Sequence, residues 1–191
     1  MKPRIGIFGG SFDPVHHGHL RAAKSFLESG LIHRLLVLCT PNPPHKPGKM
    51  TPMHHRMEML KRAFAGMDDV VISDLEKNLS SPSYTLQTIR YLKSENPESA
   101  YYLCLGEDSI EQFHNWYHYR EILEEVPLLV AERPGFDSSR VDPEILIRTI
   151  FIDHKPVDIS STEIRKSGDT TELLPDTVRS YIEAHQLYRD N

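Results

Sequence analysis

The chain has 191 residues, 39% hydrophobic and 26% charged, which is enough to bury a sizeable core without disulfides or structural metals. Its formal net charge of −5 argues against a general nucleic-acid binder, because such proteins carry a basic excess. No apolar run approaches the roughly 18 residues that span a bilayer, and the N-terminus lacks a signal-peptide pattern. We therefore expect a cytoplasmic protein without nucleic-acid or membrane partners. Its 2 cysteines lie in apolar runs and should be reduced core thiols.

Short apolar runs alternate with helical patterns along the chain. The expected strands cover residues 4–8, 34–39, 70–73, 100–105, 128–131 and 149–152. Apolar residues at three- and four-residue spacing predict helices over 18–28, 52–65, 84–95, 109–115, 119–124 and 175–185. The alternation predicts an α/β fold, with a Rossmann-like open and mostly parallel sheet that has helices on both faces. No repeat or long linker divides residues 1–191, so we expect one domain whose ligands lie beyond the carboxyl ends of the strands.

A glycine turn and a histidine pair follow the first expected strand, where residues 9–19 read Gly-Gly-Ser-Phe-Asp-Pro-Val-His-His-Gly-His. A turn of this kind before a helix directs backbone N–H groups and the positive end of the helix dipole at an anion. His16 and His19 would lie on one side of the helix start and donate hydrogen bonds to phosphate oxygens during phosphoryl or nucleotidyl transfer. The spacing fits neither a dinucleotide fingerprint nor a P-loop. Histidines that only cap a helix are the alternative.

A proline-rich stretch follows the second expected strand at residues 40–50. Its 4 prolines exclude a helix or a central strand. The stretch is either an exposed loop or a mobile phosphate clamp, in which His45 and Lys46 face a triphosphate. His-His-Arg follows at 54–56, where the next helix begins. Adjacent histidines do not share a helix face, so we expect a solvated helix start there rather than a metal site.

Three later segments place polar groups where expected strands or helices begin or end. Pro-Ser-Tyr-Thr at 82–85 is a good capping sequence, and a helix start also suits a bound carboxylate. Leu-Gly-Glu-Asp at 105–108 ends a strand, and Asp108 is able to accept hydrogen bonds from ribose hydroxyls. An acidic first helical turn explains Glu107 equally well. Arg133 follows a strand and is able to clamp a phosphate.

The last two candidate features are an aromatic ring and a serine-rich helix start. Trp116, the only tryptophan, has polar neighbours untypical of the core. Its ring either stacks on a base or pyridine ring or is an ordinary amphipathic aromatic at a helix end. Ile-Ser-Ser-Thr-Glu-Ile-Arg at 159–165 is either a helix cap or a second phosphate cradle. In a cradle, Ser161 and Thr162 would lie at the β/γ end of ATP, and Arg165 would neutralise charge.

Together, the histidine motif and the serine motif resemble the two signatures of the nucleotidyltransferase superfamily, His-x-Gly-His and Ile-Ser-Ser-Thr-x-x-Arg. From residue 4 to 188, the motif order and spacing resemble the bacterial nicotinate-nucleotide adenylyltransferases. The resemblance implies that the adenylyl group of ATP is transferred to nicotinate mononucleotide, forming nicotinate adenine dinucleotide and pyrophosphate in NAD biosynthesis. It further implies that Mg²⁺ arrives with ATP. The oligomeric state is not decided by the resemblance, and a homo-oligomer is one of the alternatives.

The resemblance also implies roles for individual residues. The catalytic residues would be His16, His19, Lys46 and Arg165. The ATP-binding residues would be Gly9, Gly10, Ser11, Phe12, His16, His19, Ile159, Ser160, Ser161, Thr162 and Arg165. The residues binding the mononucleotide would be His45, Lys46, Ser83, Tyr84, Thr85, Gly106, Asp108, Trp116, Tyr117 and Arg133. No side chain is implied as a metal ligand.

The sequence has no serine elbow or catalytic cysteine arrangement, so direct in-line attack by the substrate's phosphate on ATP is simpler than a covalent intermediate. Three alternatives stay open. Phosphopantetheine adenylyltransferases and cytidylyltransferases share the first motif, but would not need the 82–85 loop, Trp116 and Arg133 together. A catalytically silent nucleotide-binding regulator would not need the intact catalytic set. The only support for a metal-binding protein is the presence of 11 histidines, and their spacing gives no convincing ligand set.

Overall fold

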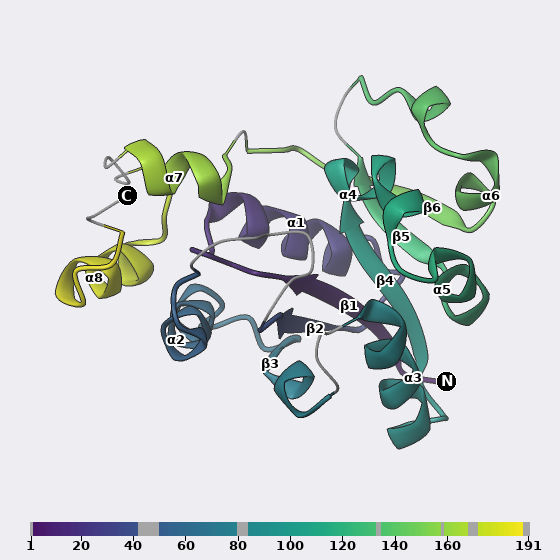
Figure 1. The fold of residues 1–191 in the computed structure, drawn as a ribbon, viewed down its shortest axis with the longest axis horizontal. Coiled ribbons are helices and arrows are strands. Elements are labelled where there is room, and N and C mark those ends of the chain that lie inside the picture. The colour runs from purple at the N-terminus through teal and green to yellow at the C-terminus, as the bar shows by residue number, and fades with distance from the viewer. Residues whose placement is uncertain are drawn as a thin grey trace.

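The computed structural model describes residues 2–41, 50–79, 84–132, 135–157, 159–167 and 172–188. Within them, six parallel strands form a sheet in the order β3-β2-β1-β4-β5-β6 (Figure 1). The strands are β1 (Arg4–Gly10), β2 (Arg34–Cys39), β3 (Val70–Ser73), β4 (Ala100–Gly106), β5 (Leu128–Glu132) and β6 (Thr149–Asp153). The predicted α/β class is therefore confirmed. All the expected strands are present, and β1, β4, β5 and β6 run slightly further than expected.

Helices alternate with these strands. The α-helices are α1 (His17–Glu28), α2 (Met53–Ala63), α3 (Thr85–Glu95), α4 (Glu107–Glu111), α5 (Tyr119–Glu125), α6 (Pro143–Leu146), α7 (Ser161–Ser167) and α8 (Asp176–Ala184). The short 3-10 turns are η1 (Leu75–Asn78), η2 (Phe113–Asn115) and η3 (Ser138–Arg140). The expected helix over 109–115 is wrong as one element, because Gln112 leaves the helical conformation between α4 and η2. The sequence analysis also missed α6, which begins with an Asp142 cap and a proline.

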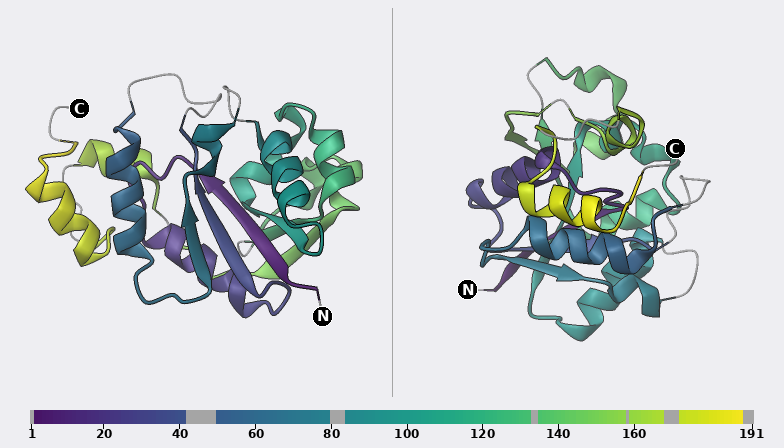
Figure 2. Two further views of the ribbon diagram at one scale, coloured as in Figure 1. Left: turned by 90° about the horizontal axis from the view of Figure 1, so that it is seen from below. Right: turned by 90° about the vertical axis from the view of Figure 1, so that its left-hand side faces the viewer.

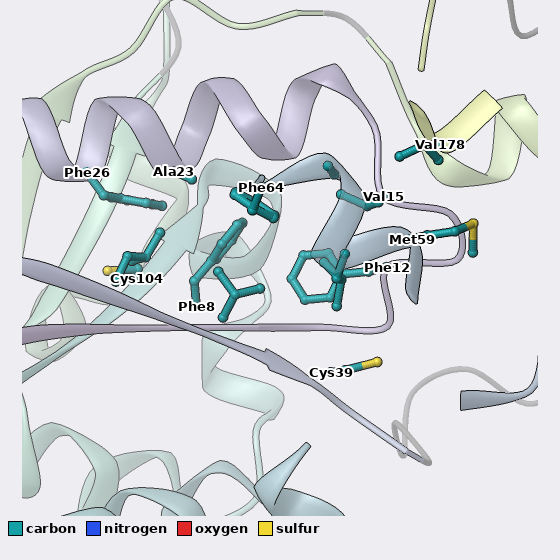
Figure 3. Close-up of a cluster of buried hydrophobic side chains, with 14 of the residues drawn as sticks. Phe8, Phe12, Val15, Ala23, Phe26, Cys39, Met59, Phe64, Cys104 and Val178 are labelled. Atoms are coloured by element: carbon teal, nitrogen blue, oxygen red, sulfur yellow. The ribbon is translucent and has the colours of Figure 1, made fainter. Parts of the chain in front are cut away.

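Helices cover both faces of the sheet, as predicted. One hydrophobic cluster joins α1, α2, α7 and α8 to side chains such as Phe8 and Cys104, and a second joins α3, α4, α5 and α6 to Ile7 and its neighbours. Successive strand residues therefore point to opposite clusters. Figure 3 shows the first cluster, with Ala23 and Phe26 of α1 above the sheet. Helix α8 packs beside α2, as both views in Figure 2 show.

Cys39 and Cys104 are free and buried in the first cluster. Burial raises the pKa of the Cys39 thiol to about 11 and also raises that of Cys104, because the thiolate would lose its hydration. The expectation of core thiols is confirmed, and neither cysteine is accessible as a reactive thiol would be.

The strand order positions the site. The chain leaves the central strand β1 toward β2 and β3, then crosses back to β4, β5 and β6 on the other side. The direction of winding therefore switches between β1 and β4, and ligands of such sheets lie beyond the carboxyl ends of the strands at this point. Gly10 ends β1 and Gly106 ends β4, so both glycine-containing motifs lie at the switch.

Candidate functional site

The turn between β1 and α1 brings the two motif histidines together. His16 is the residue before α1, in extended conformation, and exposes 6% of its surface. Its backbone N–H donates to Nδ1 of His19 at 3.2 Å, and the ring centroids lie 3.8 Å apart. Both imidazoles thus lie on one side of the helix start, as their spacing predicts. The contact also caps the helix, so capping and a paired-imidazole site are compatible here.

Gly18, between the two histidines, leaves room for the His16 ring. A Cβ added at Gly18 would lie 3.0 Å from Cε1 and from Nδ1 of His16. Any larger residue would displace either the ring or the turn. The glycine of this motif is therefore required by a close approach and not by a left-handed backbone.

The ring of Phe12 packs against the ring of His19. Its φ of 47° is left-handed, a conformation that costs free energy for a residue other than glycine. The residue is 1% exposed, and its ring meets that of His19 edge-on at 4.9 Å and that of Phe8 at 5.6 Å. Figure 3 shows the Phe12 ring among the core side chains. The strain at this turn is thus offset by packing of the ring.

The serine motif docks on the histidine motif, although the two are far apart in the sequence. Helix α7 begins at Ser161, whose hydroxyl donates to the carbonyl of Pro14 at 2.9 Å. One turn later, Arg165 donates to the carbonyl of Asp13 at 2.6 Å and to Oγ1 of Thr162 at 3.3 Å. Figure 1 shows α7 beside the start of α1. Two phosphate-binding candidates therefore form one surface.

Ser160 plays the capping role that the sequence left open. Its hydroxyl accepts from the backbone N–H of Glu163 at 3.1 Å, and the Glu163 carboxylate accepts from the backbone N–H of Ser160 at 3.0 Å. This reciprocal pair is a capping box. Capping thus explains Ser160, whereas Ser161 and Arg165 contact the other motif.

A cleft of about 360 Å³ lies between the starts of α1, α4 and α7. The predicted site residues that line it are Gly9, Gly10, Phe12, His16, His19, Gly106, Asp108, Ile159, Ser160, Ser161 and Thr162. The sequence analysis missed His154, which lines the cleft just after β6 and has Nδ1 at 3.0 Å from the Ser25 hydroxyl. Its one sequence signal is its place after the carboxyl end of a strand.

Some of the described residues that were predicted to bind the mononucleotide lie outside the cleft, near the start of α3. The rings of Tyr84 and Tyr117 stack with centroids 4.2 Å apart and planes inclined by 27°, and Thr85 begins α3 beside them. Trp116 packs against Phe113 at 5.1 Å and is half-buried. The expectation that Trp116 lies away from the core therefore holds only in part. These contacts join the start of α3 to the segment before α5.

Several predicted residues do not line the cleft. Ser11 is buried, and Arg165 reaches the turn through the carbonyl of Asp13. The predictions for His45, Lys46, Ser83 and Arg133 fall outside the residues that the structure describes.

The expectation of a solvated helix start at 54–56 is wrong for Arg56. Its side chain is 2% exposed and is the largest of the fully buried side chains in the described residues. It donates to backbone carbonyls of three separate segments, which compensates its burial. The signal in the sequence was helical periodicity, because the residues three, four and seven positions later, Met59, Leu60 and Ala63, are all buried.

Asp13 is a second polar residue that the sequence analysis did not assign. Its carboxylate is buried, with 5% of the residue exposed, and accepts from Oη of Tyr188 at 2.6 Å and from the backbone N–H of Thr51 at 3.2 Å. Burial and this carboxylate raise the pKa of Tyr188. The first motif is thus tied to the chain beyond α8.

Glu76 is a buried carboxyl near the same edge of the sheet. It is 6% exposed, and Oε1 accepts from Oγ1 of Thr88 on α3 at 2.9 Å. Burial raises the pKa of Glu76, and this outweighs the hydrogen bonds from Thr88 and Thr40, which lower it. Glu76 therefore connects α3 to the end of β2 while favouring its protonated form.

This raised pKa predicts a pH-dependent effect of Glu76→Gln. A carboxyl with a raised folded-state pKa stabilises the fold below its unfolded-state pKa, and that contribution is lost as the pH rises through the folded-state value. We expect the wild type to lose stability relative to Glu76→Gln as the pH rises above about 4.5, the ordinary pKa of a glutamate side chain. Urea unfolding across this range measures the difference, with exposed Glu95→Gln on α3 as control. A difference between wild type and Glu76→Gln that does not change with pH would contradict the prediction.

The described residues contain no group of three His, Cys, Asp or Glu side chains arranged to hold a metal ion. No helix in the described part of the chain is long and apolar enough to cross a membrane.

Residues 7–167 match the family model described as cytidylyltransferase-like. A curated relative from Thermotoga sp. (strain RQ2), named "Probable nicotinate-nucleotide adenylyltransferase", is 41% identical and covers 94% of this chain and 95% of its own. A relative of the same name from Salinibacter ruber is 34% identical and covers 97% of both chains. A solved structure of Plasmodium falciparum nicotinic acid mononucleotide adenylyltransferase complexed with NaAD is 25% identical, with a TM-score of 0.81 over 99% of this chain and 98% of that chain.

Proposed function

The chain belongs to the cytidylyltransferase-like family and, within it, to the nicotinate-nucleotide adenylyltransferases, and we propose that it transfers the adenylyl group of ATP to nicotinate mononucleotide. The products are nicotinate adenine dinucleotide and pyrophosphate, a step of NAD biosynthesis. The observation that carries the proposal is the docking of the serine motif on the histidine motif beside one cleft. Imidazoles, hydroxyls and a guanidinium gathered in this way suit a reaction that spreads charge over phosphates. We assign the activity to one cytoplasmic domain over residues 1–191.

We infer a direct displacement. A phosphate oxygen of the mononucleotide attacks the α-phosphorus of ATP in line, a new P–O bond forms, and the bond to the α,β-bridging oxygen breaks with its electron pair leaving on pyrophosphate. In our assignment, His16 and His19 donate hydrogen bonds to oxygens of the phosphorus under attack. Lys46 and Arg165 neutralise charge on the departing phosphates. No covalent intermediate is needed.

The two substrates are assigned to two neighbouring regions. ATP occupies the cleft, where Gly9, Gly10 and the residues 159–162 lie. The mononucleotide lies toward the start of α3, where the backbone N–H groups near Thr85 suit the pyridine carboxylate. The other mononucleotide-binding residues in this assignment are His45, Lys46, Ser83, Tyr84, Trp116, Tyr117 and Arg133, together with Gly106 and Asp108, which also line the cleft.

We propose Mg²⁺ as the divalent ion that accompanies ATP. Glu107 and Asp108 line the cleft, and acidic surroundings of this kind are compatible with an ion held mainly by phosphate oxygens and water. Bound in this way, the ion would offset the negative charge of the triphosphate. The side chains would contribute position and solvent exclusion.

Pyrophosphate release from ATP with a panel of acceptors tests the proposal. Nicotinate mononucleotide should be the best acceptor, nicotinamide mononucleotide weaker, and phosphopantetheine inactive. A charge-assisted hydrogen bond is worth about 1.5 to 3 kcal/mol against about 0.5 to 1.5 for a neutral one, so one contact to the carboxylate gives about tenfold preference for the acid. Activity with phosphopantetheine alone would show that the proposed substrate is wrong. Equal kcat/KM values for the two pyridine mononucleotides would show that the proposed preference for the acid is wrong.

Trp116→Ala should weaken mononucleotide binding and leave ATP binding nearly unchanged. Loss of a stacking ring costs about 1 to 3 kcal/mol, which is roughly 5- to 150-fold in affinity. Calorimetry with each substrate separately measures the effect, and Trp116→Phe should recover part of it. The control is His114→Ala, an exposed neighbour in η2. Weaker ATP binding in Trp116→Ala would instead assign the ring to the adenine side or to the core.

A further inference from the structure

The buried side chain of Arg56 forms hydrogen bonds with three chain segments next to the site. It extends from α2, and its Nη1 donates to the carbonyls of Ser11 and Thr40, each at 2.8 Å. Its Nε donates to the carbonyl of Thr51 at 2.9 Å, and Nη2 donates to that of Pro41 at 3.2 Å. These acceptors belong to the β1–α1 turn, the end of β2 and the stretch before α2. One guanidinium therefore fixes the relative positions of three chain segments.

The contact with Ser11 has consequences for the next residue. A peptide group is planar, so holding the Ser11 carbonyl fixes the orientation of the peptide that enters Phe12. Phe12 has the left-handed φ of 47°, which persists only where the surroundings impose it. The Phe12 ring in turn lies 4.9 Å from the ring of His19. Arg56 is thus connected to His19 through two intermediate residues without contacting it.

We propose that Arg56 is a positioning residue for adenylyl transfer, which holds the turn at Ser11 and Phe12 in its strained form and thereby keeps the His19 imidazole paired with His16. The kinetic part of this inference rests on the proposed function, whereas the effect on His19 rests on the geometry alone. The role requires a guanidinium. A lysine ammonium carries its donors on one nitrogen and is unable to span carbonyls on different sides of the fork.

The test compares Arg56→Lys and Arg56→Ala with Arg62→Ala, a control on the same helix whose half-exposed side chain pairs with Glu58 at 2.8 Å. We expect both Arg56 variants to lower kcat by about 10²-fold, as small misplacements of catalytic groups do, with smaller changes in the KM for ATP. The NMR resonances of the His19 ring in the ligand-free protein should shift in both. Ethylguanidinium should restore part of the kcat of Arg56→Ala, and ethylammonium should not. Arg62→Ala should show none of these effects.

Phe12→Leu tests the intermediate step, because it keeps an apolar side chain but removes the ring edge that meets His19. It should reproduce the kcat loss and the His19 shift with Arg56 intact. Unchanged His19 resonances in either Phe12→Leu or Arg56→Lys would overturn the positioning role. So would loss of the fold in both Arg56 variants by circular dichroism, which would assign the residue to stability alone.

The two proposals fail in different ways. If the wild type transfers no adenylyl group to any acceptor while the His19 resonances still move in Arg56→Lys, the proposed function is wrong and the geometric link stands. If transfer occurs but Arg56→Lys keeps the wild-type kcat, the function stands and the positioning role is wrong.

Discussion

His19→Ala is expected to lower the kcat of adenylyl transfer by about 10²- to 10³-fold, the usual cost of losing one preorganised donor to a transition state. The fold should remain, because His19 lies in the first turn of α1 beside the cleft and alanine is a good helix former. Steady-state kinetics with saturating ATP and nicotinate mononucleotide measure the effect, and urea unfolding checks the fold.

His17→Ala is the matched control, one residue after His16. His17 begins α1 and is not among the residues lining the cleft, and its backbone N–H, which alanine keeps, donates to the carbonyl of Leu173 at 3.1 Å. Its kcat should stay near that of the wild type. Equal losses in His17→Ala and His19→Ala would show that the histidine face has been assigned wrongly.

Arg165→Ala should also lower kcat by about 10²-fold or more, because a guanidinium that neutralises departing phosphates would be lost. Arg165→Lys should recover only part of the activity, since a lysine keeps the charge but not the two-pronged donor geometry. Single-turnover kinetics separate the chemical step from ATP binding in both variants.

Arg165 also binds the carbonyl of Asp13, so the variant needs a control for the structural contact. Lys166→Ala removes a positive charge from the adjacent, exposed position of α7 and should leave kcat nearly unchanged. If Lys166→Ala matched Arg165→Ala, general electrostatics at this helix would explain the loss. If Arg165→Ala lost stability but kept its kcat, Arg165 would be structural.

Much of the fold was predictable because strands buried on both faces and amphipathic helices leave local patterns. The strand order itself was not predicted; it places β4 beside β1, so that the carboxyl ends of these two strands meet where the direction of winding switches. The histidine pair was also predictable from local sequence, because a spacing of three residues at a helix start places the two rings on one side of the helix. The individual elements and the histidine pair depend on residues close together in the sequence, whereas the pairing of β1 with β4 does not.

The supporting contacts were not predictable, because their partners are distant and mostly backbone. Helical periodicity signalled the burial of Arg56, but no sequence pattern marks the carbonyls of Ser11 and Thr40 as its acceptors. Glu76 in η1 accepts a hydrogen bond from Thr88 in α3, and no pattern in either segment marks the two side chains as partners. The helix expected over 109–115 failed for a local reason, a break at Gln112 that side-chain periodicity does not reveal.

The contact between Asp13 and Tyr188 has a consequence for how the protein folds. The two residues are 175 positions apart, so the turn of the histidine motif depends on a phenol from a distant part of the chain. Because contacts between distant residues form only after the entropy of closing the intervening loop has been overcome, the contacts of this turn with Tyr188 and Arg165 depend on the rest of the domain being folded. The turn of the histidine motif is therefore held in place only when the segment beyond α8 is docked, which couples the local stability of the turn to that of residues 185–188.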